Sequence, residues 1–557
     1  MTEQVDFHAP SARTLELTDL KVIVLSAVVF LYALIHLLYF VNLHTMEWTT
    51  NQEMPFILRG LDPGFNSEDF FTNSVENSPR VGFAFVIHTL IALGMDWETA
   101  LYTVKSALIL VRPLLIFFIV LRLAEGMLTT TGSRKYLSGV VISGALFASF
   151  VYWIDGAYMI AGWDMVFAND VLSPMSLAAT LLMGALLVLV SQRWRGSLLA
   201  TGALIAMAGW IHPVMGLVGW AWIAIFLVGL REKPLNALRE GALLLPFALV
   251  PAVVLQLMFG EPGSDLSARA YRDIYVTWRH PWHFDMAYAV NHMRGLPIVG
   301  LAFALALILA LEARAWRIVT MLGLMAGLAI GALVTQYITT NLLAISLFVS
   351  LGPSRTVNML CLFLFLGLLM AAMARMSSSA GGVKQNDTTT PARPLGHSGF
   401  SILGALLLSL PIAGYSVLKG PPLPEQRAIV AWLKDNTGPS DVVAFMDLRP
   451  NRPEQGGYFE DNHLTSVIRV YGERPIFYDK TFPLRRHAAV EFRDRHDTAR
   501  AMVVEDLSDL KCAAQPFRLD YAIYSQEHPN MPDTTPDFEG GPYKLFRVPP
   551  PAEPCQG

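Results

Sequence analysis

The sequence is poor in charge, in cysteine and in metal-binding motifs, and each shortage excludes a class of protein. Only 15% of its 557 residues are Asp, Glu, Lys or Arg, whereas soluble domains carry about 25%. The formal net charge of −4 argues against a nucleic-acid partner, because such a partner would favour a basic surface. No C-x-x-C or H-E-x-x-H spacing is present, so the common sequence patterns of a zinc site are missing.

Cysteine is scarce, and the three cysteines have different surroundings. Cys361 lies inside an apolar stretch, where we expect it to pack as a small hydrophobic side chain. Cys512 and Cys555 fall in the polar C-terminal region. They could form a disulfide if that region lies outside the cytoplasm, but nothing in the sequence fixes the distance between them.

Hydrophobic residues are abundant instead, at 53% of the chain, and the mean hydropathy is +0.43. They occur in repeated runs of the kind that cross a bilayer, which takes about 20 residues per helix. The first run is too long for a signal peptide and has no small-residue cleavage site after it. The sequence therefore predicts an α-helical polytopic membrane protein with about 11 transmembrane helices, at 21–43, 98–123, 137–154, 171–191, 197–211, 214–230, 240–259, 296–312, 316–335, 355–374 and 399–418.

The distribution of positive charge predicts the topology. If 81–95 is a helix on the membrane surface rather than a span, most loop Lys and Arg residues fall on one side, which is then cytoplasmic. The N-terminal tail 1–20 and a flexible linker at 376–398 lie on that side. The long segment 44–97 and the C-terminal region 419–557 lie on the opposite, extracytoplasmic side. The chain is then a multi-pass protein with its N-terminus in the cytoplasm and its C-terminus outside. The charges are Arg13, Lys21, Arg122, Arg134, Lys135, Arg193, Arg195, Arg231, Lys233, Arg239, Arg314, Arg317, Arg375, Lys384 and Arg393.

The C-terminal region 419–557 has the pattern of a small α/β domain. A helical spacing over 425–436 is followed by short apolar runs typical of buried strands. Helical stretches between strands indicate βα units and a partly parallel sheet. The predicted strands are 442–445, 474–478, 521–524 and 543–548.

The polar stretch from Thr45 to Arg80, in the predicted first outward loop, contains the most informative pair, Glu68 and Asp69. A carboxylate there could act as a general base on an acceptor hydroxyl or hold a divalent metal such as Mg²⁺ or Mn²⁺. The alternative is that the pair are solvated loop charges, or an N-cap of the helix that follows. Asn51, Gln52, Glu53, Arg59 and Asp62 share the stretch and could line the same site.

Other candidate residues lie in the predicted outward loops and at helix ends. Asp164 could supply a second carboxylate, for substrate or metal. His212, before Pro213, faces a protein cavity more often than lipid at such a position, although it could simply bond to a neighbouring helix. Arg279, His280 and His283 lie in a cluster rich in Trp, Arg and His that offers donors for a phosphate and aromatic faces for a sugar. The alternative is an aromatic belt with cations that reach the interface.

The candidate basic residues in the second half of the chain form two groups. Arg355 opens a predicted span at headgroup depth, where a guanidinium could bind a lipid phosphate or serve only as an anchor. Arg469, Arg474 and Lys480, in the C-terminal region, are interpreted as ordinary exposed surface residues.

Taken together, these features resemble the GT-C superfamily of integral-membrane glycosyltransferases. The resemblance rests on one helix, a long outward loop with the acidic pair Glu68–Asp69, a surface helix, further spans and an extracytoplasmic α/β domain. It implies a polyprenyl-phosphate sugar donor, a glycan, lipid or protein acceptor, and a catalytic carboxylate in that loop, which takes the proton from the acceptor hydroxyl. Asp69 is the first choice, with Glu68 beside it. A divalent metal is compatible with the resemblance.

The chain is also similar to a group of uncharacterised bacterial multi-spanning proteins. That similarity rests on Arg279-His280-Pro281-Trp282-His283 and on Arg474-Pro475…Lys480…Pro483. By the resemblance, Arg355 and Arg279 would neutralise the leaving phosphate. The positions of Asp164, His212, His280 and His283 predict that these residues contact substrate. The resemblance implies synthesis of a cell-envelope glycan or glycolipid in the inner membrane of a bacterium.

Three other functions stay open. A transporter or lipid flippase would place ionisable groups at mid-membrane on broken helices and often shows internal repeats, and no repeat is evident. An acyl or phosphoethanolamine transferase would show a His-centred motif or a metal set with a Ser or Thr nucleophile, and neither is visible. A non-catalytic assembly partner of an envelope polysaccharide system would tolerate loss of the acidic pair.

Overall fold

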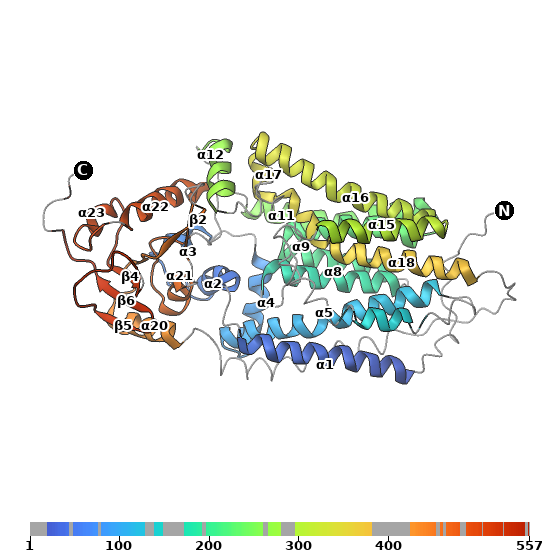
Figure 1. Ribbon diagram of the computed structural model, residues 1–557, viewed down its shortest axis with the longest axis horizontal. Coiled ribbons are helices and arrows are strands. Elements are labelled where there is room, and N and C mark those ends of the chain that lie inside the picture. Colours follow the sequence, from blue (N-terminus) through green and yellow to red (C-terminus); the bar gives the residue numbers. More distant parts are fainter. Residues whose placement is uncertain are drawn as a thin grey trace.

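The computed structural model describes most of the chain and shows a helical bundle that carries a mixed α/β domain at one end (Figure 1). We call the end of the bundle next to this domain the domain-facing end. The described residues are 19–43, 48–75, 80–128, 137–148 without 138 and 147, 172–191, 196–259, 266–279, 296–380, 424–452, 457–460, 464–479, 486–551 without 504 and 527, and 555.

Long apolar helices build the bundle because each can satisfy its backbone hydrogen bonds within itself while its side chains face lipid or other helices. Helix α5 is central and buried along most of its length, whereas α11 exposes apolar side chains such as Leu257. The bundle helices are α1 (Asp19–Leu43), α5 (Trp97–Met127), α8 (Pro174–Ser191), α9 (Ser197–Ile211), α10 (Pro213–Leu230), α11 (Pro234–Phe259), α15 (Leu296–Glu312), α16 (Trp316–Gln336) and α18 (Leu360–Ala380).

Within the described residues, six helices are long and apolar enough to cross a membrane, rather than the eleven predicted. The prediction is wrong because several apolar runs form helices that are too short to cross a membrane. Helix α9, for example, has 15 residues and rises about 22 Å, which is less than the roughly 30 Å of a hydrocarbon core. The predicted span 399–418 lies outside the described residues, and so does part of 137–154. The six are Trp97–Met127, Pro174–Ser191, Pro213–Leu230, Pro234–Phe259, Trp316–Leu342 and Ser346–Ser378.

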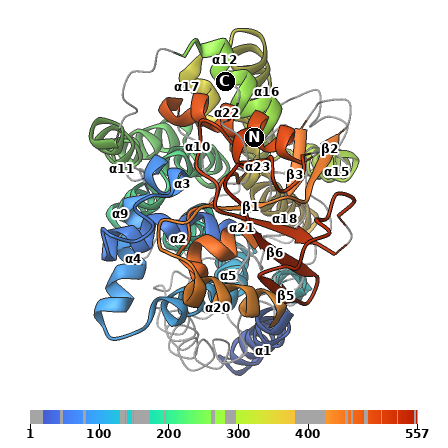
Figure 2. The same ribbon diagram turned by 90° about the vertical axis from the view of Figure 1, so that its left-hand side faces the viewer.

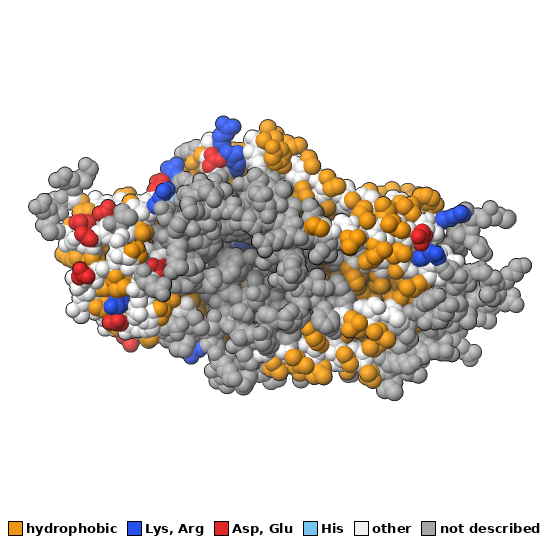
Figure 3. Space-filling view, in the orientation of Figure 1, with side chains coloured by type: hydrophobic (Ala, Val, Ile, Leu, Met, Phe, Trp, Pro, Cys, Tyr) orange, Lys and Arg blue, Asp and Glu red, His pale blue; other side chains and the backbone are white. Residues whose placement is uncertain are grey.

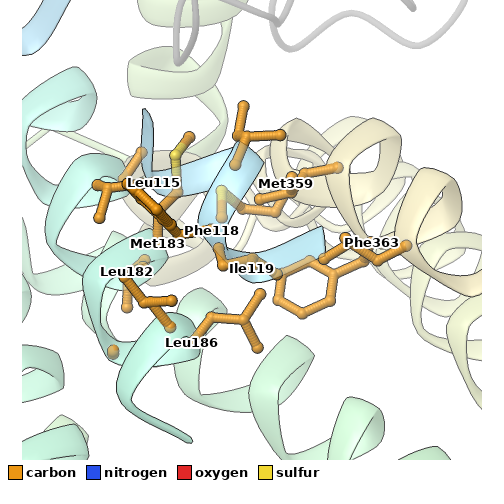
Figure 4. Packing of buried hydrophobic residues seen from close by; sticks show 14 of the residues in the cluster. Leu115, Phe118, Ile119, Leu182, Met183, Leu186, Met359 and Phe363 are labelled. Atoms are coloured by element: carbon orange, nitrogen blue, oxygen red, sulfur yellow. The ribbon is translucent and has the colours of Figure 1, made fainter. Parts of the chain in front are cut away.

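The core of the bundle is a close-packed layer around α5 (Figure 4). Phe118 and Ile119 of α5 lie against Leu182 and Leu186 of α8 on one side and Phe363 of α18 on the other. Hydrophobic side chains also spread over the bundle surface, whereas charged side chains gather on the domain and at the far end of the bundle on the face that Figure 3 shows. Such a broad apolar surface is expected of a protein whose bundle faces lipid.

Three short helices between α1 and α5 line the domain-facing end. They are α2 (Trp48–Leu61), α3 (Phe70–Ser74) and α4 (Val81–Ala92). Helix α4 runs across the end of the bundle rather than along it (Figure 1), as expected of a surface helix, and it packs on α5 and α9. Helix α2 contacts α4 on one side and the C-terminal domain on the other.

Two helices of the bundle break near the same end. The α16 helix continues into a π-helix, η2 (Tyr337–Leu342), and the short α17 (Ser346–Leu351) is followed by a 3-10 helix, η3 (Pro353–Met359). Gly352 makes the turn between α17 and η3 with φ of 60°, a left-handed conformation that glycine adopts without strain. Non-helical backbone at this depth is tolerated where protein covers it. A further short pair, α12 (Ala268–Arg272) and η1 (Asp273–Arg279), lies beside α17.

The C-terminal domain contains a four-stranded sheet in the order β1-β4-β6-β5. Strand β1 (Val443–Phe445) pairs parallel to β4 (Tyr521–Ser525), and β6 (Tyr543–Arg547) pairs antiparallel to both β4 and β5 (Phe538–Gly540). The predicted partly parallel sheet is confirmed. The predicted strand 474–478 makes only an isolated bridge, between Ile476 and Val443. A separate antiparallel pair is formed by β2 (Leu448–Arg452) and β3 (Gly457–Glu460).

Helices cover the sheet and join it to the bundle, as the view onto the domain shows (Figure 2). Helix α20 (Pro424–Asn436) matches the predicted helix, and its Ile429 and Leu433 pack on β1 and β4. The shared core of domain and bundle includes Phe71, Tyr271 and Phe492. The Cys512–Cys555 disulfide, which the sequence left open, is present and ties the chain end to α23 (Leu510–Ala513). The remaining elements are α21 (Leu464–Val467), η5 (Ile468–Gly472), η6 (Arg486–Ala488) and α22 (Ala489–Met502).

Candidate functional site

Asp69, the first-choice catalytic acid, is fully buried where α3 meets the C-terminal domain. It is the N-cap of α3, and its Oδ2 accepts hydrogen bonds from the Thr72 N–H and the Thr72 hydroxyl, both at 2.7 Å. Its Oδ1 accepts the backbone N–H of Ile476 at 3.1 Å. The capping role that the sequence offered as an alternative is therefore confirmed.

Arg469 of η5 connects Asp69 to a second buried carboxylate. Its Nε donates to Asp69 Oδ2 at 3.0 Å, and its Nη1 donates to Asp479 Oδ2 at 2.7 Å. All three side chains are 0% exposed. Asn66, two residues before the acidic pair, also donates its Nδ2 to the Arg469 carbonyl at 2.7 Å. We call Asp69, Arg469 and Asp479 the buried triad. It fastens the acidic segment to the domain.

The two members of the acidic pair thus have opposite surroundings. Glu68 is exposed, whereas Asp69 has both oxygens engaged by protein donors. A catalytic base has to reach the proton that it removes, and of the two carboxylates Glu68 is the one open to a substrate. The assignment of either residue as catalytic stays a prediction.

A second set of charged residues lies at the domain-facing end of the bundle, around His212. This residue occupies the turn between α9 and α10 and is buried. Burial lowers the pKa of His212 to about 3, and the positive charges of Arg355 and Arg80 add to that shift. The imidazole is therefore neutral at physiological pH. Because Nδ1 accepts the Met215 N–H at 3.2 Å, the ring proton lies on Nε2, which can donate to a ligand.

Arg80 and Glu53 complete this set. Arg80 precedes α4, and its guanidinium forms an ion pair with the buried carboxylate of Glu53 on α2. Helix α4 approaches the α9–α10 turn closely at Gly82, where a Cβ atom would lie 2.4 Å from the Trp210 carbonyl oxygen. This close approach brings Arg80 near His212. We call Glu53, Arg80, His212 and Arg355 the basic cluster.

A cavity of about 430 Å³ lies beside the cluster, between α2 and α4. Its volume is within the range of small-molecule sites, about 300–1,000 Å³. Val81, the residue after Arg80, forms part of its wall, whereas the four cluster residues are not among those that line it. The lining residues are Phe56, Arg59, Gly60, Pro63, Val81, Ala84, Phe85 and His88.

The remaining predicted site residues are not brought into the cluster by the described structure. Asp164, His280 and His283 lie outside the described residues, and Arg279 is the last residue of η1, with its side chain not described. The structure therefore places His212 and Arg355 together and leaves these four as predictions.

Two arginines of the domain were predicted to be ordinary surface residues, and that prediction is wrong. Arg469 is 0% exposed because it bridges two buried carboxylates. Arg474 is buried because its guanidinium donates to several carbonyls at the end of α20, including those of Leu433 and Thr437. It thereby satisfies carbonyl groups that a helix end leaves open. Lys480 lies outside the described residues.

A metal site at the acidic pair is not supported by the geometry of Asp69. Its Oδ2 already accepts three donors and its Oδ1 one, so few lone pairs are left for a cation. Within the part of the chain that the structure describes, no three or more His, Cys, Asp or Glu side chains lie close enough together to hold a metal ion.

Sequence reasoning misses Arg80 and Asp479 as members of these groups. Arg80 closes the polar stretch that carries the acidic pair, and Glu53 lies in the same stretch, so their shared location was the available signal. Asp479 and Arg469 come together with Asp69 only through the packing of the domain on the bundle.

No protein-family model matches the chain, and no curated protein matches it.

Proposed function

We propose that the protein is a membrane glycosyltransferase that transfers a sugar from a polyprenyl-phosphate-linked donor to an acceptor on the extracytoplasmic face. The observation that carries the proposal is the basic cluster at the domain-facing end of the bundle. Two guanidinium groups and a neutral imidazole N–H near one carboxylate provide donors for a phosphate and a base for a hydroxyl.

The location suits a lipid-linked substrate. The bundle offers an apolar surface to lipid, and the cluster lies where the bundle ends and the polar domain begins. A phosphate on a long hydrocarbon chain would reach such a position from the membrane. The Cys512–Cys555 disulfide agrees with an oxidising compartment for the domain, as the predicted orientation requires. The inner membrane of a bacterium stays the proposed location.

In the proposed reaction, Arg355 and Arg80 neutralise the phosphate of the donor. A carboxylate of the α2–α4 segment takes the proton from the acceptor hydroxyl while its oxygen attacks the anomeric carbon. The bond from that carbon to the phosphate oxygen breaks, and the polyprenyl phosphate leaves with the bonding electrons. The candidates for the base are Glu68, which is exposed, and Glu53, which lies in the cluster.

A comparison of arginine variants on one continuous element tests the proposal. Arg355 lies in η3 at the domain-facing end, whereas Arg375 lies near the far end of α18, where it pairs with Glu312 in an exposed ion pair. The purified wild type, Arg355→Gln and Arg375→Gln would be given radiolabelled polyprenyl-phosphate sugars, and binding and turnover would be recorded. We expect turnover by the wild type and by Arg375→Gln, with at least about a tenfold loss of donor affinity for Arg355→Gln. Equal behaviour of the two variants would count against a phosphate site at the cluster.

The acidic pair is tested in the same assay. Glu68→Gln keeps the fold, since Glu68 is exposed, so lost turnover with retained donor binding would assign Glu68 as the base. Full turnover by Glu68→Gln would leave Glu53 as the candidate. If the wild type neither binds nor turns over any donor, the glycosyltransferase proposal is wrong.

A second candidate function is transport of an anionic substrate, and two buried cations inside α5 favour it. Lys105 and Arg112 lie seven residues apart on one face of α5, and both are almost fully buried. Arg112 donates its Nε to the Thr180 hydroxyl and its Nη2 to the Ser176 carbonyl, both at 2.8 Å. Ionisable residues within a membrane span often mark a substrate path. Arg112 could equally join α5 to α8 as a structural link.

Flux measurements distinguish the two functions. In liposomes that contain the protein, a transporter would move a labelled anionic lipid or sugar phosphate between the two sides without any sugar acceptor. Arg112→Gln would abolish that movement and leave donor turnover in detergent unaffected. Turnover that needs an acceptor, with no flux, would support the enzyme.

A further inference from the structure

The Glu53–Arg80 ion pair differs from an ordinary structural pair in how its two members are exposed. The side chain of Glu53 is 5% exposed, whereas that of Arg80 is 30% exposed. A ligand can therefore reach the guanidinium while the carboxylate stays covered. Glu53 lies in α2 and Arg80 directly precedes α4, and residues of these two helices line the cavity of about 430 Å³.

Further hydrogen-bond donors for an anion lie near Arg80. Arg80 and Arg355 both lie close enough to His212 for their positive charges to lower its pKa. A phosphate bound there would take hydrogen bonds from two guanidinium groups and from the His212 Nε2–H. These are charge-assisted bonds, and so is the bond from Arg80 to Glu53. The phosphodiester of a polyprenyl-phosphate sugar carries one negative charge, so it displaces the carboxylate through the additional donors of Arg355 and His212 rather than through a larger charge.

We propose that the donor phosphate takes Arg80 from Glu53, and that the released Glu53 carboxylate is then the base of the transfer reaction. A covered carboxylate that loses its cationic partner becomes a stronger base. It accepts the proton of the acceptor hydroxyl as that oxygen bonds to the anomeric carbon and the phosphate departs, still held by Arg80 and Arg355. The base is thus produced only when a donor is bound. This inference rests on the proposed function.

Binding of farnesyl phosphate, a short polyprenyl phosphate without a sugar, tests the exchange directly. Wild type, Glu53→Gln, Arg80→Gln and the double variant would be titrated in detergent. Since Glu53 competes with the phosphate for Arg80, we expect Glu53→Gln to bind about three- to tenfold more tightly than the wild type. It should nevertheless lose turnover of the sugar-linked donor. Arg80→Gln should bind about tenfold more weakly.

The control is a second Arg–Glu pair of the bundle. Arg122 and Glu125 lie near the far end of α5, at 2.6 Å, with both side chains less than 10% exposed. Glu125→Gln removes a carboxylate from an arginine of the same membrane domain, but away from the cluster, so farnesyl phosphate binding should not change. Titration with inorganic phosphate and with phosphatidic acid identifies the source of the anion. The proposal requires farnesyl phosphate to bind more tightly than either.

The double variant keeps the test decisive if Glu53→Gln folds poorly. Without Arg80 there is nothing for Glu53 to compete for, so the double variant should bind farnesyl phosphate as weakly as Arg80→Gln. Tighter binding than Arg80→Gln, or weaker binding by Glu53→Gln than by the wild type, would overturn the exchange and leave the proposed function standing. A wild type that binds no polyprenyl phosphate would overturn both.

Discussion

The buried triad and the basic cluster are both charged groups at the domain-facing end, but they differ in how completely their charges are satisfied. In the triad, Asp69, Arg469 and Asp479 are all 0% exposed. In the cluster, Arg80 is 30% exposed and forms an ion pair with Glu53, and its neighbour Val81 lines a cavity. Complete enclosure indicates a structural link, whereas partial access beside a cavity is typical of a binding site.

The difference changes how the acidic segment is interpreted. An acidic pair in an outward loop predicts catalysis at both residues, but the triad uses Asp69 to hold the segment against the domain. The carboxylate oxygens of Asp69 are bonded to Thr72, Arg469 and Ile476. The exposed Glu68 and the covered Glu53 are not held in this way. The domain has a role that follows from the triad, since it fixes the segment that carries these carboxylates.

The largest expected effect is on the triad. Arg469→Ala leaves Asp69 and Asp479 buried without their shared cation, which costs about 3–5 kcal/mol for a buried ion pair. It also removes the guanidinium that lies 4.9 Å from the ring centroid of Phe71. Thermal unfolding in detergent would measure the loss. The control is Arg518→Ala, because Arg518 is 53% exposed, and such pairs contribute less than about 1 kcal/mol. Equal losses for the two variants would refute the structural role of the triad.

The neighbouring carboxylates Asp69 and Glu68 test the same difference between an enclosed and an accessible charge. Asp69→Asn puts an amide N–H₂ where the native oxygen faces donors, so we expect a loss of about 2–4 kcal/mol in the free energy of unfolding. Glu68→Gln changes an exposed side chain, and its effect should stay within about 0.5 kcal/mol. Chemical denaturation of the two variants gives the measurement. If Asp69→Asn is as stable as Glu68→Gln, then Asp69 is free enough to act as the base and the interpretation of the triad is wrong.

Elements set by local pattern could be predicted from the sequence. The helix Pro424–Asn436 and the strands β4 and β6 were found because their apolar spacing is a local signal, and the parallel pairing followed from the helix between strands. The number of spans could not be predicted, because hydropathy alone does not show where a helix ends. The α16 helix, for example, continues as the π-helix Tyr337–Leu342.

The candidate site also has residues that could be predicted from the sequence and contacts that could not. His212 and Arg355 could be selected from the sequence because both lie at the ends of predicted spans. The pairing of Asp69 with Arg469 could not, because 400 residues separate them, and burial of Arg469 depends on that pairing. Arg80 joins the cluster only because Gly82 lets α4 approach the backbone of Trp210.

Gly82 allows a test of how the cluster is assembled. Gly82→Ala places a Cβ atom 2.4 Å from the Trp210 carbonyl oxygen, so α4 must move, at a cost of about 1–3 kcal/mol. Donor binding should weaken with it, because Arg80 precedes this turn of α4. Gly300→Ala, in α15, is the control: nothing lies within 4 Å of its added Cβ, and alanine favours a helix by roughly 1 kcal/mol over glycine. An unchanged donor affinity in Gly82→Ala would mean that α4 does not position Arg80.

The last expected effect is a pH dependence that distinguishes the cluster from the triad. The native pKa of His212, about 3, lies below its ordinary value of 6.5. Between these values the unfolded chain binds a proton that the folded protein does not. The free energy of unfolding is therefore highest above pH 6.5, and it declines as the pH falls toward 3 by at most about 1.4 kcal/mol per pH unit. Thermal unfolding of the wild type between pH 8 and pH 5 should show this decline, and His212→Gln should show less of it. The two curves should run parallel above pH 6.5, where the histidine is neutral in both states. Parallel curves below pH 6.5 would mean that His212 is not buried among positive charges, and the cluster would lose the member that joins Arg80 to Arg355.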